Sequence, residues 1–544
     1  MKSSKTHTIA IMIFAIFFIL SCTNEDIEQD QNANRKSIYY SEEEIVLGTK
    51  LPNPYNIDNM KETYNDLFAS GSITEPIDVK VTDLYVRFLP KDSLDLKFLY
   101  EEKNLILFEY PLDYDIEKAG SYYHDPSISE DEITWLYTTV KPDFEFPSSM
   151  QYEVLDRCFI PRDEGKEGVL SSLDILEQKA FERVGLLEKF QPEESDTKGW
   201  FSGYKPKGTF RVYDTDLNRL EGIKGVRVKC NLIVKCAYAN TNENGYYSIS
   251  TKFALNPFYT ISFSNTMDFT IWNNYTPITA FYYMGVHSRK GHNHDLYTNS
   301  VGWSLSTINN ATYDYYTSLC FGQNPLRIPP SKLKILQLKS ESKSSASMIR
   351  RINDLIYINS PNPFKDLMSS IYSIPVNMLL RLVQSGLPDI TIGAKSNSSK
   401  SIYSTTIHEL AHASHFSQVG SYYWSQYINY IITCYANGLD TYGNIDTPNS
   451  GICGVGEMWG YAIGNLITKE RYSLVQSEQG FYYWFKPQII YKLITDSRTS
   501  LSPYQIFYCL TEDITSHQLL KSKLKYTYPV VSRGIEEIFN EENF

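Results

Sequence analysis

The chain has 544 residues and a formal net charge of −12 at pH 7, with 51 Lys and Arg against 63 Asp and Glu. This length exceeds that of one ordinary domain, and an apolar content of 42% is enough to fill several hydrophobic cores. The acidic balance argues against nucleic acid as a partner, because the phosphate backbone binds basic surfaces.

The first 21 residues have the pattern of a targeting segment. Lys2 and Lys5 precede an apolar run from Ile9 to Leu20, which is too short to span a bilayer comfortably. The run ends in Leu-Ser-Cys, which resembles the lipobox of bacterial lipoproteins. The resemblance implies removal of a signal peptide over residues 1–21 and lipidation of Cys22. An ordinary secretory signal is the alternative.

Acidic residues follow at positions 25, 26, 28 and 30. They resemble the surface-export signal of some Gram-negative lipoproteins, although a solvated tether has the same composition. We therefore expect a lipoprotein of the outer membrane, exposed on the cell surface and attached to the membrane through Cys22. Residues 22–37 are expected to form a linker.

Residues 38–198 are expected to form a mixed N-terminal domain. Strand-like alternation occurs in VKVTDLYVRFLP and NLILFEYPLDY, and helical patterns occur in NMKETYNDLFAS and SSLDILEQKAFERVGLL. No motif in this region indicates a chemistry, and the lone His124 is expected to be structural or exposed.

Seven cysteines remain when Cys22 is set aside, and an odd number leaves at least one unpaired in an exported protein. Cys230 and Cys236 lie in KCNLIVKC. On one extended strand they would be about 20 Å apart, which is too far for a disulfide.

Residues 203–266 show clear strand alternation, with Asn-Glu-Asn-Gly as a turn between two strands. The segments GVRV (225–228) and TNENGYY (241–247) resemble the carboxypeptidase regulatory-like domain, a small transthyretin-like β-sandwich. The resemblance implies a spacer or contact module that supplies no catalytic residues.

The region 267–544 begins with three histidines in eight residues, His287, His292 and His294. They could bind a metal, but the glycine and polar residues around them favour an exposed loop. A helix is expected in SLSTINNATYDYYTSLCFG, and strands are expected in LKILQLK and DITIGAK.

The stretch TTIHELAHASHF, residues 405–416, contains the pattern HExxH. On an α-helix, His408 and His412 share one face and can bind one zinc ion, while Glu409 lies beside it as a base. Thr406 and Glu409 also match a capping box, which would occupy the glutamate. We prefer a helix that starts earlier, at Ser401 or Ser404, and leaves Glu409 available.

The third zinc ligand is expected to be Glu457 in GVGEMWGYAIGNLI. Taken as a helix, this segment places Gly460, Tyr461 and Gly464 on the face of Glu457, and the two glycines would allow close packing against the HExxH helix. Asp440, in a probable turn GLDTYG that loosely resembles the aspzincin motif, is the alternative ligand. The metzincin pattern is excluded because His415 and Gln418 stand where it requires Gly and His.

These residues resemble those of gluzincin-type zinc metallopeptidases, and the order helix, strand, insertion, strand and HExxH helix fits the zincin core. The fold class expected for the whole chain is multidomain α+β: a mixed N-terminal domain, a small β-sandwich and a zincin-like α+β domain.

The resemblance implies that His408, His412 and Glu457 hold Zn²⁺ and that Glu409 acts as general base on a metal-activated water. Tyr461 is a candidate donor to an oxyanion, with Tyr423 and Tyr442 as weaker candidates. His415 shares the histidine face and is expected to touch substrate or to pack. The implied substrate is an extracellular peptide or protein. The alternative is a surface-anchored binding lipoprotein whose zincin-like fold no longer catalyses.

Overall fold

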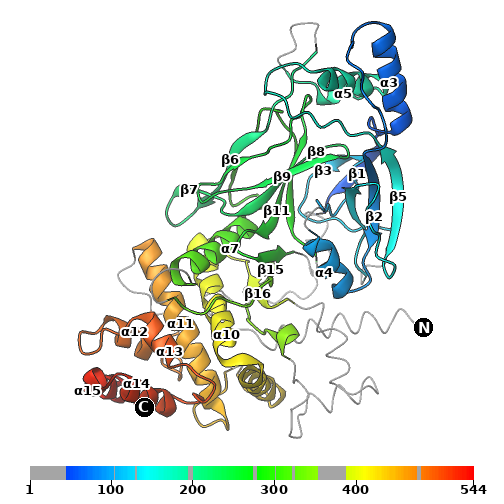
Figure 1. The fold of residues 1–544 in the computed structure, drawn as a ribbon. Helices are drawn as coiled ribbons and strands as arrows, with labels where there is room; N and C mark the ends of the chain where they lie inside the picture. The colour runs from blue at the N-terminus through cyan, green and yellow to red at the C-terminus, as the bar shows by residue number, and fades with distance from the viewer. Residues whose placement is uncertain are drawn as a thin grey trace.

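The computed structural model describes residues 44–102, 105–128, 132–193, 200–273, 278–300, 302–320, 325–352, 388–440, 442–473 and 480–544. The expected signal peptide, Cys22 and the linker lie outside these residues. Helices and strands both contribute, and the strands form several sheets, which agrees with the expected α+β class. In Figure 1 the N-terminal elements lie at the upper right, green strands occupy the middle, and the helices that follow lie below them.

The N-terminal region combines an antiparallel three-stranded sheet, in the order β4-β2-β5, with a strand pair and helices. Its strands are β1 (Val46–Lys50), β2 (Asp83–Leu89), β3 (Tyr114–Lys118), β4 (Leu136–Val140) and β5 (Gln151–Cys158), and its helices are α3 (Ile57–Ala69), α4 (Ser93–Glu101), α5 (Ser172–Arg183) and α6 (Leu187–Phe190). The strand predicted in VKVTDLYVRFLP and both predicted helices are confirmed. NLILFEYPLDY is not a continuous strand, because Phe108 forms only an isolated bridge to Tyr137 and β3 begins at Tyr114.

Two sheets make up the middle of the molecule. One contains β6 (Lys207–Asp214), β7 (Arg219–Gly222), β10 (Tyr246–Ser248) and β14 (His294–Leu296). The other contains β8 (Val226–Leu232), β9 (Lys235–Asn240), β11 (Phe258–Asn265), β12 (Phe269–Trp272), β13 (Phe281–Val286), β15 (Leu333–Leu338) and β16 (Ile390–Gly393).

The two sheets share one hydrophobic core. The ring of Tyr247 in β10 lies 4.8 Å from that of Phe210 in β6 and 6.5 Å from that of Tyr259 in β11. β13 and β14, which follow residue 266, pair with β11 and β6. Strands on both sides of residue 266 therefore belong to the same sheets.

KCNLIVKC is a hairpin and not one extended strand, but Cys230 and Cys236 are unpaired, as expected. The chain turns at Ile233, whose φ is 49°, and β8 pairs with β9. Cys230 lies opposite Ala237 and Cys236 lies opposite Asn231, so the two thiols point to opposite faces of the sheet. The seven cysteines in the described part of the chain are unpaired thiols, all of them buried except the half-buried Cys236.

The second half of the chain adds a helical layer. Its helices are α7 (Gly302–Tyr315), which continues into a π-helical turn (Tyr316–Cys320), then a 3-10 turn (Ile349–Arg351), α10 (Ser399–Ala436), α11 (Ser450–Tyr472), α12 (Gln488–Thr495), α13 (Pro503–Tyr508), α14 (His517–Thr527), a second 3-10 turn (Pro529–Val531) and α15 (Ser532–Glu541). The predicted helices of the C-terminal region and the strands β15 and β16 are confirmed. Among the described residues, no helix is both long and apolar enough to cross a membrane.

α10 follows the parallel strands β12, β15 and β16 and packs against both α7 and α11. In Figure 1, α10 and α11 run side by side below the sheet. Residue Gly420, with φ 80° and ψ 179°, breaks α10 into two helical segments. The break changes the direction of the second segment relative to the first.

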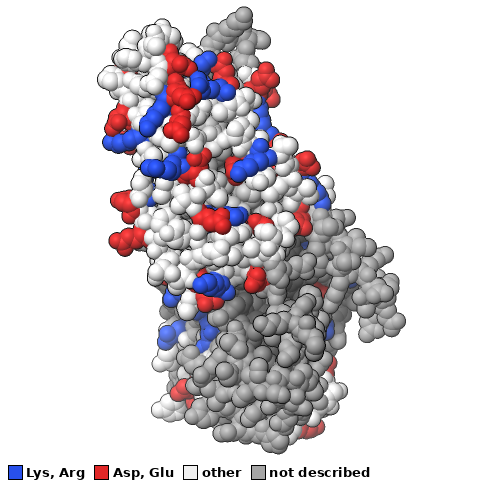
Figure 2. All heavy atoms as spheres, turned by 90° about the vertical axis from the view of Figure 1, so that its right-hand side faces the viewer, with Lys and Arg blue, Asp and Glu red and all other residues white. Residues whose placement is uncertain are grey.

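Buried ion pairs join the N-terminal region to the middle sheets. Lys229 lies 3.3 Å from Glu109, and Lys235 lies 2.8 Å from Glu177; all four side chains are at most 5% exposed. On the face seen in Figure 2, acidic and basic side chains alternate over the N-terminal elements. The described part of that face therefore carries no large patch of a single sign.

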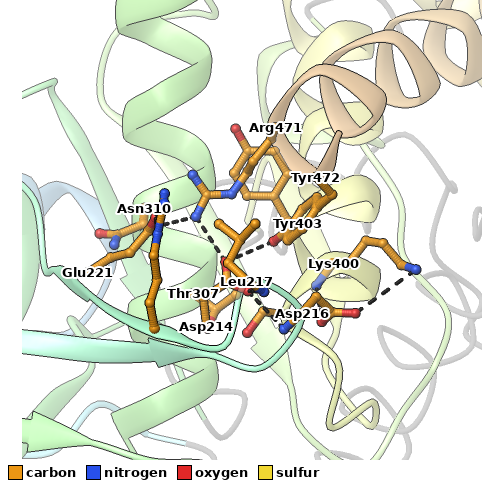
Figure 3. A network of polar contacts seen from close by, with 12 residues as sticks. Asp214, Asp216, Leu217, Glu221, Thr307, Asn310, Lys400, Tyr403, Arg471 and Tyr472 are labelled. Carbon is orange, nitrogen blue, oxygen red and sulfur yellow. Dashed lines mark hydrogen bonds and ion pairs between the residues drawn. The ribbon is translucent and has the colours of Figure 1, made fainter. Parts of the chain in front are cut away.

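A polar network joins the middle sheets to the helical layer (Figure 3). Arg471, at the end of α11, contacts Asp214 at 3.0 Å and also Glu221. A second contact from Arg471 reaches Asp314 of α7 at 3.3 Å. Tyr472 donates a hydrogen bond to Asp214 as well, at 3.1 Å.

Candidate metal centre

The first segment of α10 carries HExxH on a buried apolar helix. Ile407, Leu410 and Ala411 are fully buried beside the histidines. The helix begins at Ser399, and the Thr406 hydroxyl donates to the Ile402 carbonyl at 2.7 Å. Thr406 is therefore inside the helix and not its N-cap, which confirms the expected earlier start.

The start of α10 is fixed by residues that follow β6. The Asp216 carboxylate accepts hydrogen bonds from the Lys400 amide and the Ser398 hydroxyl, both at 3.0 Å. Thr215 and Ser399 exchange two hydrogen bonds of 3.0 and 2.8 Å. An anion at a helix N-terminus satisfies free amides and interacts favourably with the helix dipole. Figure 3 shows Asp216 beside Lys400 at this junction.

The structure brings His408, His412 and Glu457 together. The two Nε2 atoms are 3.1 Å apart. Glu457 Oε2 lies 3.6 Å from Nε2 of His408, and Oε1 lies 3.5 Å from Nε2 of His412. The three side chains are 6%, 2% and 1% exposed, respectively, so the convergence is in the interior.

No protein-family model matches this chain, and no curated protein matches it either.

Glu409 adds a second carboxylate to the cluster. One of its oxygens and one nitrogen from each of His408 and His412 lie within 4.8 Å of one another. This group could hold a metal ion with Glu409 as a ligand, whereas the expected arrangement uses Glu457. We favour Glu457, because its two oxygens lie 3.5–3.6 Å from the two Nε2 atoms. Glu409 is then left beside the centre.

Asp440 lies in an exposed turn, as expected for GLDTYG. Its carboxylate accepts a hydrogen bond from the Tyr442 amide at 3.0 Å, and its carbonyl accepts one from Gly443 at 2.9 Å. Its side chain is thus used within the turn, and the carboxylate that faces the histidines belongs to Glu457.

Two glycines on α11 allow the close approach of α10. A Cβ atom at Gly460 would lie 2.8 Å from His412 Nε2 and 3.0 Å from His408 Cε1. One at Gly464 would lie 3.4 Å from His408 Cβ, which is an ordinary contact. Gly460 therefore has no room for a side chain. The expected role of the two glycines, to let α11 pack closely against α10, applies most strongly to Gly460.

Tyr427, which the sequence did not single out, holds the carboxylate of Glu457. Its hydroxyl donates a hydrogen bond to Glu457 Oε1. Tyr427 lies in the second segment of α10, after the break at Gly420. Because metal-binding carboxylates are commonly oriented by such outer contacts, Tyr427 is a positioning residue for the candidate ligand.

The electrostatics of the cluster suit a divalent cation. Burial, together with the neighbouring His412, lowers the pKa of His408 to about 3, although Glu457 acts in the opposite direction. Burial raises the pKa of Glu457, but the two histidines and Tyr427 outweigh that effect and hold the pKa below its ordinary value. A neutral imidazole next to an ionised carboxylate is the donor combination that zinc requires.

Tyr461 lies against the centre, as its position one turn after Glu457 predicts. Its ring centroid is 4.4 Å from that of His408, and its hydroxyl is 3.3 Å from that of Tyr442. Tyr423 instead donates to the Ile514 carbonyl at 3.2 Å. The two hydroxyls of Tyr461 and Tyr442 thus form a pair close to His408.

His415 is packed among aromatic rings. It is 1% exposed, and its ring lies 5.3 Å from Tyr423 and 5.8 Å from Trp424. Burial, with a smaller contribution from His412, lowers its pKa to about 3. Of the two roles considered for it, these contacts favour packing.

Proposed function

We propose that the protein is a zinc-dependent peptidase that hydrolyses peptides or proteins outside the cell. The observation that carries the proposal is the convergence of His408, His412 and Glu457 from two helices, with Glu409 next to the histidines. The protein would belong with gluzincin-like enzymes, in which the third ligand is a glutamate from a later helix.

The residues present fit a zinc ion. Two imidazole nitrogens 3.1 Å apart and a carboxylate at 3.5–3.6 Å provide three ligands and leave a fourth position open. Bound zinc would supply a Lewis acid for peptide hydrolysis. Glu409 would take the proton of the attacking water and return it to the leaving amine. Tyr461 would donate a hydrogen bond to the developing oxyanion.

The architecture that accompanies this proposal is a zincin-like domain whose parallel strands continue one sheet of a β-sandwich. The parallel strands β12, β15 and β16 followed by α10 support the first. The turn before Tyr246 and the two facing sheets support a transthyretin-like module. An anchor at Cys22 would place the enzyme on the outer membrane and its substrate outside the cell.

Burial of the centre favours a second candidate, a surface-bound lipoprotein that holds zinc without catalysing hydrolysis. Glu409 is 0% exposed and His412 is 2% exposed. A substrate therefore needs a movement of the protein to reach Glu409, whereas a structural zinc does not.

One experiment separates the two candidates. Purified protein is analysed for zinc, and hydrolysis of a broad peptide library is compared for the wild type and Glu409→Gln. The peptidase proposal expects roughly one zinc in the centre of both proteins and loss of about 100-fold or more of the activity in the variant. Zinc without hydrolysis in the wild type would establish the binding lipoprotein instead. Failure of His408 and His412 to bind zinc would reject both.

A further inference from the structure

The segment from Val286 to His294 brings three histidines together on the middle sheets, away from the HExxH sequence. The rings of His287 and His292 stack with centroids 3.5 Å apart and planes at 5°. Nε2 of His292 lies 3.3 Å from Nδ1 of His294. All three side chains are half-buried, so they are reachable from solvent without being mobile surface groups.

The backbone of this segment is held by hydrogen bonds on both sides. The His292 amide donates to the Tyr247 hydroxyl at 3.1 Å, and that hydroxyl lies 3.0 Å from the His292 carbonyl. His294 starts β14 and pairs with Phe210 in β6. The Asn293 side-chain oxygen accepts a bond from the Thr209 amide at 2.8 Å.

Gly291 makes this close approach feasible. It has a φ of 137°, and a Cβ atom there would lie 1.6 Å from the Lys207 carbonyl oxygen. The sequence favoured an exposed loop because no strand seemed to fix the histidines. The structure shows that β14 and the contacts with β6 and β10 fix them.

The nitrogens of His292 and His294 are close enough to share one metal ion. Neutral imidazoles offer a lone pair, and they suit zinc, copper and nickel. Two nitrogens bound tetrahedrally at about 2.0–2.1 Å would be roughly 3.3 Å apart. The separation of His292 and His294 matches this value.

We propose that His292 and His294 bind a second divalent transition-metal ion, such as Zn²⁺, at a site independent of His408 and His412. His287 acts as a positioning residue: its Nε2 lies 3.0 Å from the Met284 carbonyl, and its ring fixes the plane of His292 by stacking. Two protein ligands leave positions for water, so the site is weaker and more open than the centre on α10 and α11.

Zinc stoichiometry in reciprocal variants tests the proposal. By equilibrium dialysis with Zn²⁺, the wild type should bind roughly two ions per chain. His292→Gln with His294→Gln should lose one of them, and so should His408→Gln with His412→Gln. Asn293→Ala, which disturbs the same segment but keeps every imidazole, should bind as much zinc as the wild type.

Two substitutions of His287 test its positioning role. His287→Phe preserves a stacking ring and should leave zinc affinity at the second site nearly unchanged, whereas His287→Ala should weaken it by about 10-fold. Equal loss in both variants would make His287 a ligand and overturn its positioning role.

The second site is rejected if the variant without His408 and His412 binds no zinc. This result is informative even if the His292 and His294 variant fails to fold, because it leaves the second site intact. It is also distinct from failure of the peptidase proposal, which concerns zinc and hydrolysis at the first centre. In the variant without His408 and His412, Zn²⁺ should raise the melting temperature, since the ion binds the folded state at the second site.

Discussion

At the residue scale, the Glu457 carboxylate is oriented from the neighbouring helix. Tyr427 donates to Oε1 of Glu457, which faces His412 at 3.5 Å. A carboxylate fixed in this way loses less entropy when it binds a metal ion than one that rotates freely.

Removal of that hydroxyl should weaken zinc binding. Tyr427→Phe keeps the ring, so we expect a fall in zinc affinity of about 10-fold or more with little change in stability. Competition with a chelator of known affinity measures it. Tyr423→Phe is the control, because its hydroxyl binds the Ile514 carbonyl and not Glu457. An equal effect of the two substitutions would show that Tyr427 has no special role.

The residues of the candidate centre differ in how well the sequence predicts them. The spacing of His408, Glu409 and His412 implies one helix face, and the glycines after Glu457 indicate a helix that packs closely. Tyr427 could not be chosen among 43 tyrosines, because its contact depends on the direction of α10 after Gly420. No spacing rule reports that direction.

At the element scale, the distance between α10 and α11 is set by Gly460. Its backbone lies against both imidazoles, and an added Cβ atom would lie within 3.0 Å of them. The Gly460 backbone on α11 and the imidazoles on α10 can move apart only if the two helices separate.

Gly460→Ala should therefore lower zinc affinity and peptidase activity together, by at least about 10-fold each. Gly464→Ala is the matched control on the same face, with a Cβ contact of 3.4 Å. Alanine stabilises a helix relative to glycine by about 1 kcal/mol. Gly464→Ala should therefore keep its zinc affinity and be more stable than the wild type. Zinc titration and chemical denaturation of both variants test the difference. Normal zinc binding by Gly460→Ala would contradict the packing argument.

The N-terminus of α10 depends on the charge of Asp216. Burial raises the pKa of this carboxyl, but hydrogen bonds from the Lys400 amide and from the Thr215 and Ser398 hydroxyls lower it more, so the folded pKa is below the ordinary value of 3.8. A carboxyl whose pKa is lowered by folding stabilises the folded state at pH values above its unfolded pKa. That stability disappears as the pH falls through the folded pKa.

Asp216→Asn should consequently cost about 1 kcal/mol of the free energy of unfolding at pH 7. The difference from the wild type should shrink as the pH falls below 3.8. Urea denaturation at several pH values measures this. Asp446→Asn, which removes a carboxylate from an exposed turn before α11, is the matched control. A difference that grows in acid would refute the assignment.

The elements themselves were predicted unevenly. The helix α7 and the strands β15 and β16 lie where the local sequence pattern predicts them. KCNLIVKC satisfies the alternation of one strand as well as that of a hairpin, and the turn at Ile233 carries none of the usual turn residues. The pairing of β13 and β14 with earlier strands is a long-range contact that local patterns do not encode.

At the scale of the whole molecule, Arg471 connects the helix that carries Glu457 to the middle sheets. It contacts carboxylates of Asp214, Glu221 and Asp314, and its own side chain is 15% exposed. Burial lowers the pKa of Arg471, but the carboxylates outweigh this and raise it above its ordinary value. The arginine stays charged; Glu221 also pairs with Arg219 and Asp314 with Lys224, whereas Arg471 is the cation that pairs with Asp214.

Arg471→Ala should destabilise the protein by about 3 kcal/mol, because it leaves the buried Asp214 carboxylate without its cation. Arg219→Ala provides a control, since that arginine pairs with the same Glu221 but is 64% exposed. We expect less than about 1 kcal/mol for the control. Guanidinium denaturation compares the two, and similar losses would show that the network does not join the layers.

These contacts differ greatly in the length of chain between the partners. His412 and Glu457 are 45 residues apart, and His408 and Glu457 are 49 apart. Arg471 and Asp214 are separated by 257 residues. The shorter loops between the histidines and Glu457 close at lower entropic cost than the loop between Asp214 and Arg471, and contacts close in sequence form faster. The pair α10 and α11, with its candidate ligands, is therefore expected to assemble early in folding, and its attachment to the middle sheets through Arg471 is a later step.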